Sequence, residues 1–379
     1  MNHQEKTHRP PVREFVALHL IDNLGAQRIR KLLQGVEHPQ LIFRLKRHEL
    51  ESIRDIGPKT ADDILTFNAW DEVDRILEKT DRIGAEIMTY WDDDYPTLLR
   101  QIYDPPIMLW IRGDRKALDT AAVSIVGTRK AGTYGRKMAD RFATELVEQG
   151  LTIISGLAYG IDGVAHRATV KAGGKTVAVL GSGIDWIYPS DHKGLASEIV
   201  QTGGAVISEF PLGEAPEMGN FPVRNRIVSG MSLGTLVVAS GMDGGSMITA
   251  KSALDQNREV FVVPHSIGHP NALGCNSLIK RGMGKLVQNV EDILTEIEVH
   301  FLEQSSSTDP VPPKEKEWES HDLDELSTNI CKTLEQEISH IDRIAEHLEM
   351  NAHEILSKLL ELEMKGCVNQ TAGKNFELC

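Results

Sequence analysis

Six short runs of apolar residues recur in the middle of the chain and alternate with longer amphipathic stretches. The runs are residues 121–126, 151–155, 176–180, 205–208, 235–240 and 260–263. Each is bounded by glycine, serine or proline, and most lack alternating polar residues. Strands buried on both faces of a parallel sheet have this pattern. The sequence therefore predicts an α/β fold with a doubly wound, Rossmann-like parallel sheet of about six strands.

Residues 1–85 have a different pattern, with apolar residues at helical spacing. The segments NLGAQRIRKLL (23–33) and DIGPKTADDIL (55–65) resemble each other, and each places a glycine before a new helix. This repeat is either a pair of helical hairpins packed for structural reasons, or a pair of helix-hairpin-helix modules whose turn amides approach DNA phosphates. The flanks are not basic and the second glycine of the usual hairpin is missing, which favours the structural interpretation.

The boundary between this helical domain and the sheet is marked by a connecting segment, residues 86–112. Pro105 and Pro106 exclude a continuous helix there. We assign residues 86–300 to the α/β core, with this segment as its N-terminal extension.

The C-terminal part of the chain predicts a small separate domain. Residues 301–322 are polar, charged and contain proline, which is typical of a linker. Residues 323–379 follow with helices expected at 323–337, 340–348 and 351–365 and two short strands around Ala372–Gly373. This is the outline of a winged helix. Its third helix carries three glutamates against two lysines, so contact with a protein is favoured over DNA reading.

Composition narrows the class of protein. Of the 379 residues, 41% are hydrophobic and 25% are charged, as in a protein of two or three domains. No stretch approaches the ~18 apolar residues of a membrane span, and the N-terminus lacks the apolar stretch of a signal peptide. The four cysteines are widely spaced, which favours reduced thiols in the cytoplasm, and no H-E-x-x-H spacing indicates a metal site.

The net charge of −14 argues against a general nucleic-acid binder, but its distribution changes that picture. Residues 301–379 contain 17 acidic and 7 basic residues, whereas residues 121–300 contain 17 and 16. A nearly neutral core whose basic residues gather in its loops can present a positive face.

Glycine-rich loops follow the strands of the predicted sheet. They are GTRKAGTYG (127–135), SGLAYGIDGVAH (155–166), GSGIDWIYPSDH (181–192) and residues 208–230, the last followed by SGMDGGSMITAKSAL (240–254). Ligands of such sheets bind at the carboxyl ends of the strands. Glycines let backbone amides approach an anion, and a following helix adds the positive end of its dipole. With Arg129 and Lys130 in the first loop, these turns indicate a site for phosphate groups.

The same loops give little support to an enzyme. They contain neither G-x-G-x-x-G nor G-x-x-x-x-G-K-[ST], so a nicotinamide or P-loop nucleotide site is not expected. Ser155, Ser182 and Ser246 stand in turns without a G-x-S-x-G motif. His166 is interpreted as a packed residue, and Asp162 as a helix cap or an acceptor for loop amides.

The stretch FPVRNRIVSG (221–230) places Arg224 and Arg226 on differing sides of a helix start, with Asn225 between them. One arginine is expected to reach the ligand, and the other to form a salt bridge within the fold, with Glu209 as a candidate partner. The sequence leaves open which arginine contacts the ligand and which forms the salt bridge.

Seven motifs together resemble the DNA-processing protein A family (DprA, also called Smf). They are SIVGTRKAGTYG, SGLAYGIDGVAH, GSGIDWIYPSDH, SEFPLG, FPVRNRIVSG, GGSMITAKSALDQNREVFVVPH and GCNSLIKRG, in order across roughly residues 95–290. The resemblance implies an extended Rossmann domain between an N-terminal SAM-like domain and a C-terminal winged helix. It also implies a non-enzymatic, cytoplasmic bacterial protein without a cofactor, which self-associates into a homodimer. Such proteins bind single-stranded DNA without strong sequence preference, protect incoming strands during natural transformation and load the RecA recombinase onto them.

The resemblance also implies which residues contact DNA. By motif, the expected ligands are Arg129, Lys130, Ser155, Gly156, Arg224, Asn225, Arg226, Gly245, Ser246 and Lys251. The chain departs from the family after FVVP, where His265 stands in place of the usual glycine. This side chain either adds a phosphate contact or fills space. Four aromatic residues at loop tips, Tyr134, Tyr159, Phe210 and Phe221, either stack bases or pack in the core.

Two other functions stay open. The parallel sheet and the GGS…T segment are similar to lysine-decarboxylase-like phosphoribohydrolases, which process nucleotides, although Asp243-Gly244-Gly245-Ser246 replaces their P-G-G-x-G-T signature. A structural adaptor acting through its acidic C-terminal domain is the third hypothesis.

Overall fold

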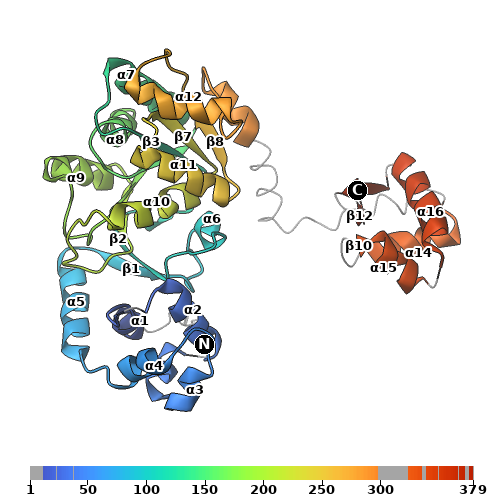
Figure 1. Cartoon of the computed structure of the whole chain (residues 1–379), viewed down its shortest axis with the longest axis horizontal. Helices are drawn as coiled ribbons and strands as arrows, with labels where there is room; N and C mark the ends of the chain where they lie inside the picture. The colour runs from blue at the N-terminus through green and yellow to red at the C-terminus, as the bar shows by residue number, and fades with distance from the viewer. Residues whose placement is uncertain are drawn as a thin grey trace, which may run out of the picture. The chain divides into compact units, whose positions relative to one another are not determined.

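The computed structural model describes residues 12–22, 24–36, 38–297, 323–334, 339–348, 350–365, 367–371 and 375–378. The chain divides into two compact units, Met1–Glu303 and Gln304–Cys379 (Figure 1). The predicted linker, residues 301–322, and the predicted turn at Ala372–Gly373 lie outside the described residues.

The first unit begins with short helices. They are α1 (Val12–His19), α2 (Ala26–Gln34), the 3-10 helix η1 (Pro39–Arg44), α3 (Arg47–Glu51), α4 (Pro58–Leu65) and α5 (Trp70–Arg82). The sequence repeat corresponds to two equivalent helix starts, because Gly25 precedes α2 and Gly57 precedes α4, both with extended backbone. Neither start has a side-chain cap. The predicted helical character of this region is confirmed.

The centre of the first unit is a sheet of nine strands in the order β1-β2-β6-β5-β4-β3-β7-β8-β9. The strands are β1 (Glu86–Thr89), β2 (Met108–Gly113), β3 (Ala122–Gly127), β4 (Thr152–Ser155), β5 (Thr176–Val179), β6 (Ala205–Ser208), β7 (Gly234–Ala239), β8 (Glu259–Val262) and β9 (Lys285–Leu286). Strands β3 to β9 pair in parallel, which confirms the predicted doubly wound sheet.

The segment 86–112 is more than a connection. Its two strands extend the sheet through antiparallel pairs, β2 with β6 and β1 with β2, with Trp110 opposite Ser208 on β6 and Ile87 opposite Trp110. The two prolines that exclude a helix lie in the loop before β2, where they leave the strand itself free to pair. The short, isolated runs around 86–89 and 108–113 gave no repeating pattern from which the two strands could be predicted.

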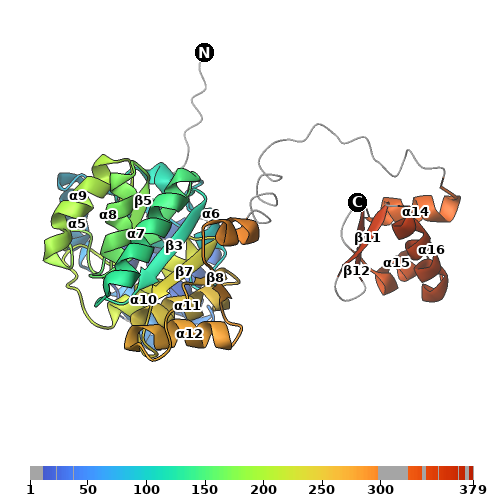
Figure 2. The same cartoon turned by 90° about the horizontal axis from the view of Figure 1, so that it is seen from above.

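Helices cover both faces of the parallel sheet (Figure 2). On one face lie α7 (Thr133–Glu148), α8 (Ile161–Lys171) and α9 (Lys193–Gln201), and on the other lie α10 (Asn220–Gly230), α11 (Gly245–Asp255) and α12 (Leu273–Lys280). Phe142 and Leu146 of α7 are fully buried, as the helical pattern requires. A short helix, α6 (Thr97–Arg100), packs against α10 near the antiparallel edge.

The N-terminal helices share a hydrophobic core with the sheet. Phe15 of α1 and Leu32 of α2 belong to the same buried cluster as Trp110 of β2. A polar contact also joins the two parts, because Lys79 Nζ of α5 lies 2.5 Å from Asp185 Oδ2 in the loop after β5. Residues 12–297 therefore form one packed body.

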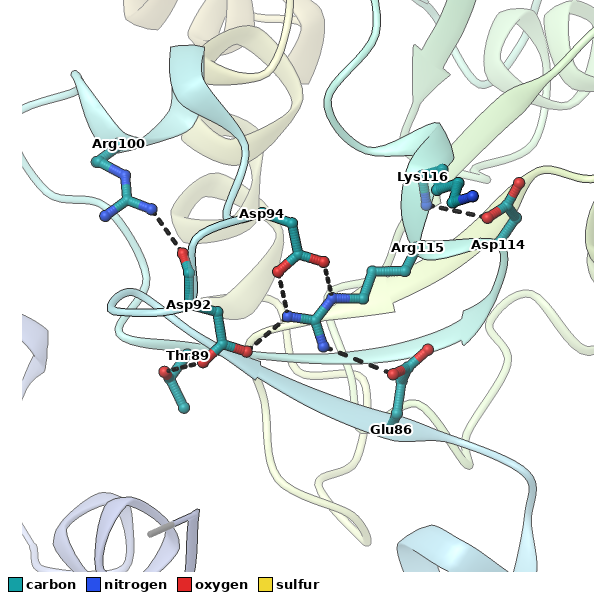
Figure 3. Close-up of polar contacts among 8 residues, drawn as sticks. All are labelled: Glu86, Thr89, Asp92, Asp94, Arg100, Asp114, Arg115 and Lys116. Atoms are coloured by element: carbon teal, nitrogen blue, oxygen red, sulfur yellow. Dashed lines mark hydrogen bonds and ion pairs between the residues drawn. The ribbon is translucent and has the colours of Figure 1, made fainter. Parts of the chain in front are cut away.

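An ion-pair network holds the antiparallel extension in place (Figure 3). Arg115, in the 3-10 helix η2 (Arg115–Ala117), lies between three carboxylates. Its Nη2 is 2.6 Å from Asp92 Oδ2 and 2.5 Å from Asp94 Oδ1, and its Nη1 is 3.5 Å from Glu86 Oε2. The network thus joins β1 and the turn after it to the crossover that follows β2.

The second unit contains a winged-helix arrangement, as predicted. Its described elements are α14 (Glu325–Leu334), β10 (Ser339–His340), α15 (Ile341–His347), α16 (Ala352–Met364), β11 (Val368–Thr371) and β12 (Asn375–Leu378). The sheet order is β10-β12-β11, so β10 adds a strand that was not predicted. Ile330, Ile344, Ile355 and Phe376 are buried in its own small core. On α16, Lys358 Nζ lies 2.5 Å from Asp324 Oδ2 and 2.8 Å from Glu361 Oε2.

Candidate nucleic-acid interface

A cavity of about 450 Å³ opens at the carboxyl ends of the central strands. The chain runs outward from β3 through β4, β5 and β6, then returns to the other side of β3 with β7. The cavity lies at this switch point, where the loops after β3 and β7 diverge and leave a crevice. The loops after β3 and β4, the start of α10 and the start of α11 form its lining.

The structure brings together seven of the ten predicted ligands. The cavity is lined by Arg129, Lys130, Gly156, Arg224, Asn225, Gly245 and Ser246. Ser155, Arg226 and Lys251 do not belong to its lining. The grouping follows from topology, because each of the seven lies in a loop or in the first two turns of a helix at the same sheet edge.

The loop after β3 turns tightly and leaves its cations exposed. A β-carbon on Gly127 would lie 2.5 Å from Ile161 Cγ1 and 2.9 Å from the carbonyl of Ala239, so the loop and the two neighbouring elements can meet only at a glycine. Arg129 and Lys130 follow and are exposed. The Arg129 guanidinium lies 5.1 Å from the centre of the Phe221 ring, a cation–π distance.

Arg224 forms the buried back of the cavity. Its side chain is 4% exposed, and it donates a hydrogen bond from Nη1 to the carbonyl of Val179. Its Nε is buried without a hydrogen-bond partner in the described structure. Burial lowers the pKa of Arg224 to about 10, with Asp162 opposing the shift, so the guanidinium stays charged at neutral pH.

Asp162 holds the loop after β4, as predicted. Its Oδ2 accepts hydrogen bonds from the amides of Gly156 and Ala158, at 3.2 Å and 3.4 Å. Burial raises the pKa of Asp162, while the nearby Arg224 charge and the two amides act in the opposite direction. The opposite charges of Asp162 and Arg224 therefore partly offset the cost of burying each other at the cavity wall.

Arg226 is the arginine that pairs within the fold. Its Nη1 and Nη2 lie 2.7 Å and 2.6 Å from the two carboxylate oxygens of Glu209, and its Nε lies 3.4 Å from Asp104 Oδ2. This confirms the expected salt bridge to Glu209 and decides which arginine makes it. The bidentate geometry joins α10 to the end of β6 and leaves Arg226 outside the cavity lining.

The other two predicted ligands outside the lining have separate positions. Ser155 is fully buried and donates from Oγ to the carbonyl of Ile125 at 2.6 Å, which links β4 to β3. Lys251 is exposed on α11, beyond the first turn that lines the cavity.

Aromatic side chains flank the cavity. Phe221 lines it, and the Phe221 ring centre lies 5.8 Å from that of Tyr188, which is 42% exposed. Tyr159 is also 42% exposed, and its hydroxyl donates to Asp191 Oδ2 at 2.8 Å. Tyr188 was missed by the sequence analysis, although its loop, GSGIDWIYPSDH, was singled out. Phe210 is half-buried and outside the lining.

Candidate catalytic groups near the cavity are engaged elsewhere. His166 is fully buried, with Nδ1 2.7 Å from Thr176 Oγ1, and burial lowers its pKa to about 3. The interpretation of His166 as a packed residue is confirmed. Ser246 donates from Oγ to Ser240 Oγ at 2.8 Å. Within the described ranges, no cluster of histidine, cysteine and carboxylate side chains could hold a metal ion, and no helix could span a membrane.

Comparisons with known proteins agree with this architecture. The family model described as DNA recombination-mediator protein A matches residues 86–298, and the DprA winged helix domain matches residues 313–374. Protein Smf of Escherichia coli (strain K12) is 38% identical over 281 residues, which cover 74% of each chain. DNA processing protein DprA of Bacillus subtilis (strain 168) is 37% identical over 246 residues, which cover 63% of this chain and 82% of that protein.

Two solved structures extend the match to three dimensions. The X-ray structure of DNA processing protein A from Streptococcus pneumoniae superposes with a TM-score of 0.66 at 32% identity, covering 76% of this chain and 99% of that one. DNA processing protein A from Helicobacter pylori, whose single-stranded DNA binding mode has been studied structurally, gives 0.52 at 28%, covering 57% and 96%. Since the family model spans more than half of the chain and these relatives share its sequence and fold, the chain belongs to the DNA recombination-mediator protein A family.

Proposed function

We propose that this chain binds single-stranded DNA without strong sequence preference at the cavity beside β3 and β7. The observation that carries the proposal is the convergence of exposed Arg129 and Lys130 with the buried charge of Arg224 around one cavity. The Helicobacter pylori relative, which binds single-stranded DNA, supports the choice of ligand.

The lining has the groups that contact a nucleic-acid backbone. Guanidinium and ammonium groups bind phosphate oxygens, and such contacts carry no sequence information. The start of α11 adds the positive end of a helix dipole. It is open to a ligand, because Gly244 has no side-chain cap and a β-carbon on Gly245 would meet nothing within 4 Å. Phe221 and Tyr188 are positioned to stack on bases. Such stacking does not depend on sequence, because every base has an aromatic face. Affinity without sequence preference follows from these two kinds of contact.

A non-enzymatic role is part of this proposal. The acidic residue in the lining, Asp162, is bound to two loop amides, and the serine in the lining, Ser246, is bound to Ser240. A phosphoribohydrolase would release free base from AMP. The proposal predicts no such release, and its detection would favour the enzyme.

The family relationship supports the rest of the proposed role. As a recombination mediator, the chain would protect incoming strands during natural transformation, act as a homodimer in the bacterial cytoplasm, and load RecA onto the bound strand. Filament formation by RecA on a strand coated with single-strand-binding protein would then be faster with this chain present.

The site is tested by replacing one exposed cation and a matched control. Arg129→Ala should weaken binding of a fluorescent oligothymidylate about tenfold or more, since a charged hydrogen bond contributes about 1.5–3 kcal/mol. Lys171→Ala removes a cation from the last turn of α8, at the opposite edge of the sheet, and should leave affinity unchanged. A duplex of equal length should bind more weakly, because its bases are already stacked. Equal affinities for wild type and Arg129→Ala would overturn the assignment.

A further inference from the structure

A second cavity of about 290 Å³ lies at the same sheet edge, beside the start of α7 and the loop between β8 and α12. Its polar lining residues are Thr133, Tyr134, His265, Ser266, His269 and Asn271. No residue of this lining is acidic. His265 and His269 both lie in the loop between β8 and α12.

Hydrogen bonds orient both imidazoles of this second cavity. His265 Nε2 lies 2.7 Å from the carbonyl oxygen of Val238, so Nε2 carries a proton and donates it. His269 Nδ1 accepts from the amide of Asn271 at 3.2 Å, which leaves the proton of the neutral ring on Nε2 as a donor. The Tyr134 ring lies edge-on to His265, with ring centres 5.0 Å apart, and its hydroxyl donates to the carbonyl of Pro264.

The two cavities are neighbours on one loop. Lys130 lines the first cavity, and its carbonyl accepts a hydrogen bond from Asn271 Nδ2 of the second cavity at 3.0 Å. Gly132, two residues further on, already lines the second cavity. A chain of phosphates held beside Lys130 can therefore continue over this loop into the second cavity.

We propose that the second cavity binds the next sugar-phosphate of the same single strand, with Nε2 of His269 as its imidazole donor and the ring of His265, fixed by the Val238 carbonyl, as part of the cavity wall. The proposal rests on the proposed function and extends it to a subsite. The chemistry of the lining fits this ligand, because it joins imidazole and amide donors, a hydroxyl and an aromatic ring without an opposing carboxylate. The first-turn amides of α7, which follow the uncapped Gly132, add to the donors.

A length series of oligothymidylates separates the two sites. The His265→Gly/His269→Ala variant should bind long oligomers about three- to tenfold more weakly than wild type, as expected from the loss of the His269 hydrogen bond. Its affinity for the shortest oligomer that still competes for the first cavity should be unchanged. Arg129→Ala should weaken binding at every length. His48→Ala, which removes an exposed histidine from α3, serves as the matched control.

Each outcome has a distinct meaning. If Arg129→Ala weakens binding at all lengths and the double histidine variant binds every length like wild type, the subsite is wrong and the proposed function stands. If Arg129→Ala has no effect, the proposed function fails and the subsite fails with it. If the histidine variant weakens short and long oligomers equally, the second cavity is not a separate subsite. His269→Ala alone, at an exposed position, repeats the test should His265→Gly lower the melting temperature.

Discussion

A β-carbon on Gly156 would lie 2.5 Å from Nη1 of Arg224. The loop after β4 and the start of α10 therefore meet in the cavity wall at a distance that only glycine allows. The guanidinium cannot simply move aside, because it is buried and donates to the carbonyl of Val179. The position of the loop and the position of the buried charge are thus coupled.

Gly156→Ala should consequently lower the free energy of unfolding by about 1–3 kcal/mol, as overpacking in a well-packed core does. It should also weaken DNA binding, because the displaced guanidinium or loop changes the cavity. Denaturant unfolding and oligothymidylate titration measure the two effects. Gly194→Ala is the matched control: its β-carbon meets nothing within 4 Å, and alanine in a helix is expected to be neutral or stabilising.

His166 should make the free energy of unfolding decrease at acidic pH. Burial lowers its pKa in the folded state to about 3, whereas an unfolded histidine titrates near ~6.5. Its contribution is therefore fully present above about pH 6.5 and is lost as the pH falls toward the folded value, by up to ~1.4 kcal/mol per pH unit. His166→Asn, whose amide can still donate to Thr176, should show a shallower loss in denaturant unfolding between pH 7 and 5. Identical slopes for the two proteins would contradict this assignment.

The parallel core was predictable because its strands repeat one signal. Apolar runs such as 121–126 and 235–240 are long enough to need burial on both faces, and the glycine-rich loops follow them directly. The antiparallel strands β1 and β2 were not predictable in this way, since each stands alone between irregular segments and pairs through register set by β6.

The site was predictable as a set of loops but not residue by residue. Arg224 and Arg226 are equivalent in the sequence, two positions apart at a helix start. The structure separates them, because Glu209 at the end of β6 pairs with Arg226, while Arg224 turns beneath Gly156. Which arginine pairs with Glu209 depends on how close β6 lies to α10. A local sequence pattern cannot predict that distance. Of the two histidines of the second cavity, the sequence marked only His265, which stands where a glycine was expected.

Arg115 should be essential to the antiparallel extension. Its side chain is 11% exposed and joins Glu86, Asp92 and Asp94, so removing it leaves a buried carboxylate without its cation (Figure 3). Arg115→Ala should lower the free energy of unfolding by about 3 kcal/mol or more, as for other broken buried pairs. The neighbouring Lys116→Ala should change it by less than ~0.5 kcal/mol, because Lys116 is exposed and uses its backbone amide to bind Asp114. Similar losses for both variants would exclude a specific role for the network.

Substitutions in the Arg226–Glu209 pair should distinguish an arginine that stabilises the fold from one that binds the ligand. Arg226→Met alone should destabilise the fold by about 3–5 kcal/mol, since it leaves the buried Glu209 carboxylate without its partner. Adding Glu209→Leu should recover most of that loss, because a buried pair can often be replaced by apolar residues of similar volume. The double variant should then bind oligothymidylate within about twofold of wild type, whereas Arg129→Ala does not. If the refolded double variant instead loses affinity as severely as Arg129→Ala, Arg226 contacts the strand directly, and the boundary of the site must be extended along α10 to Arg226.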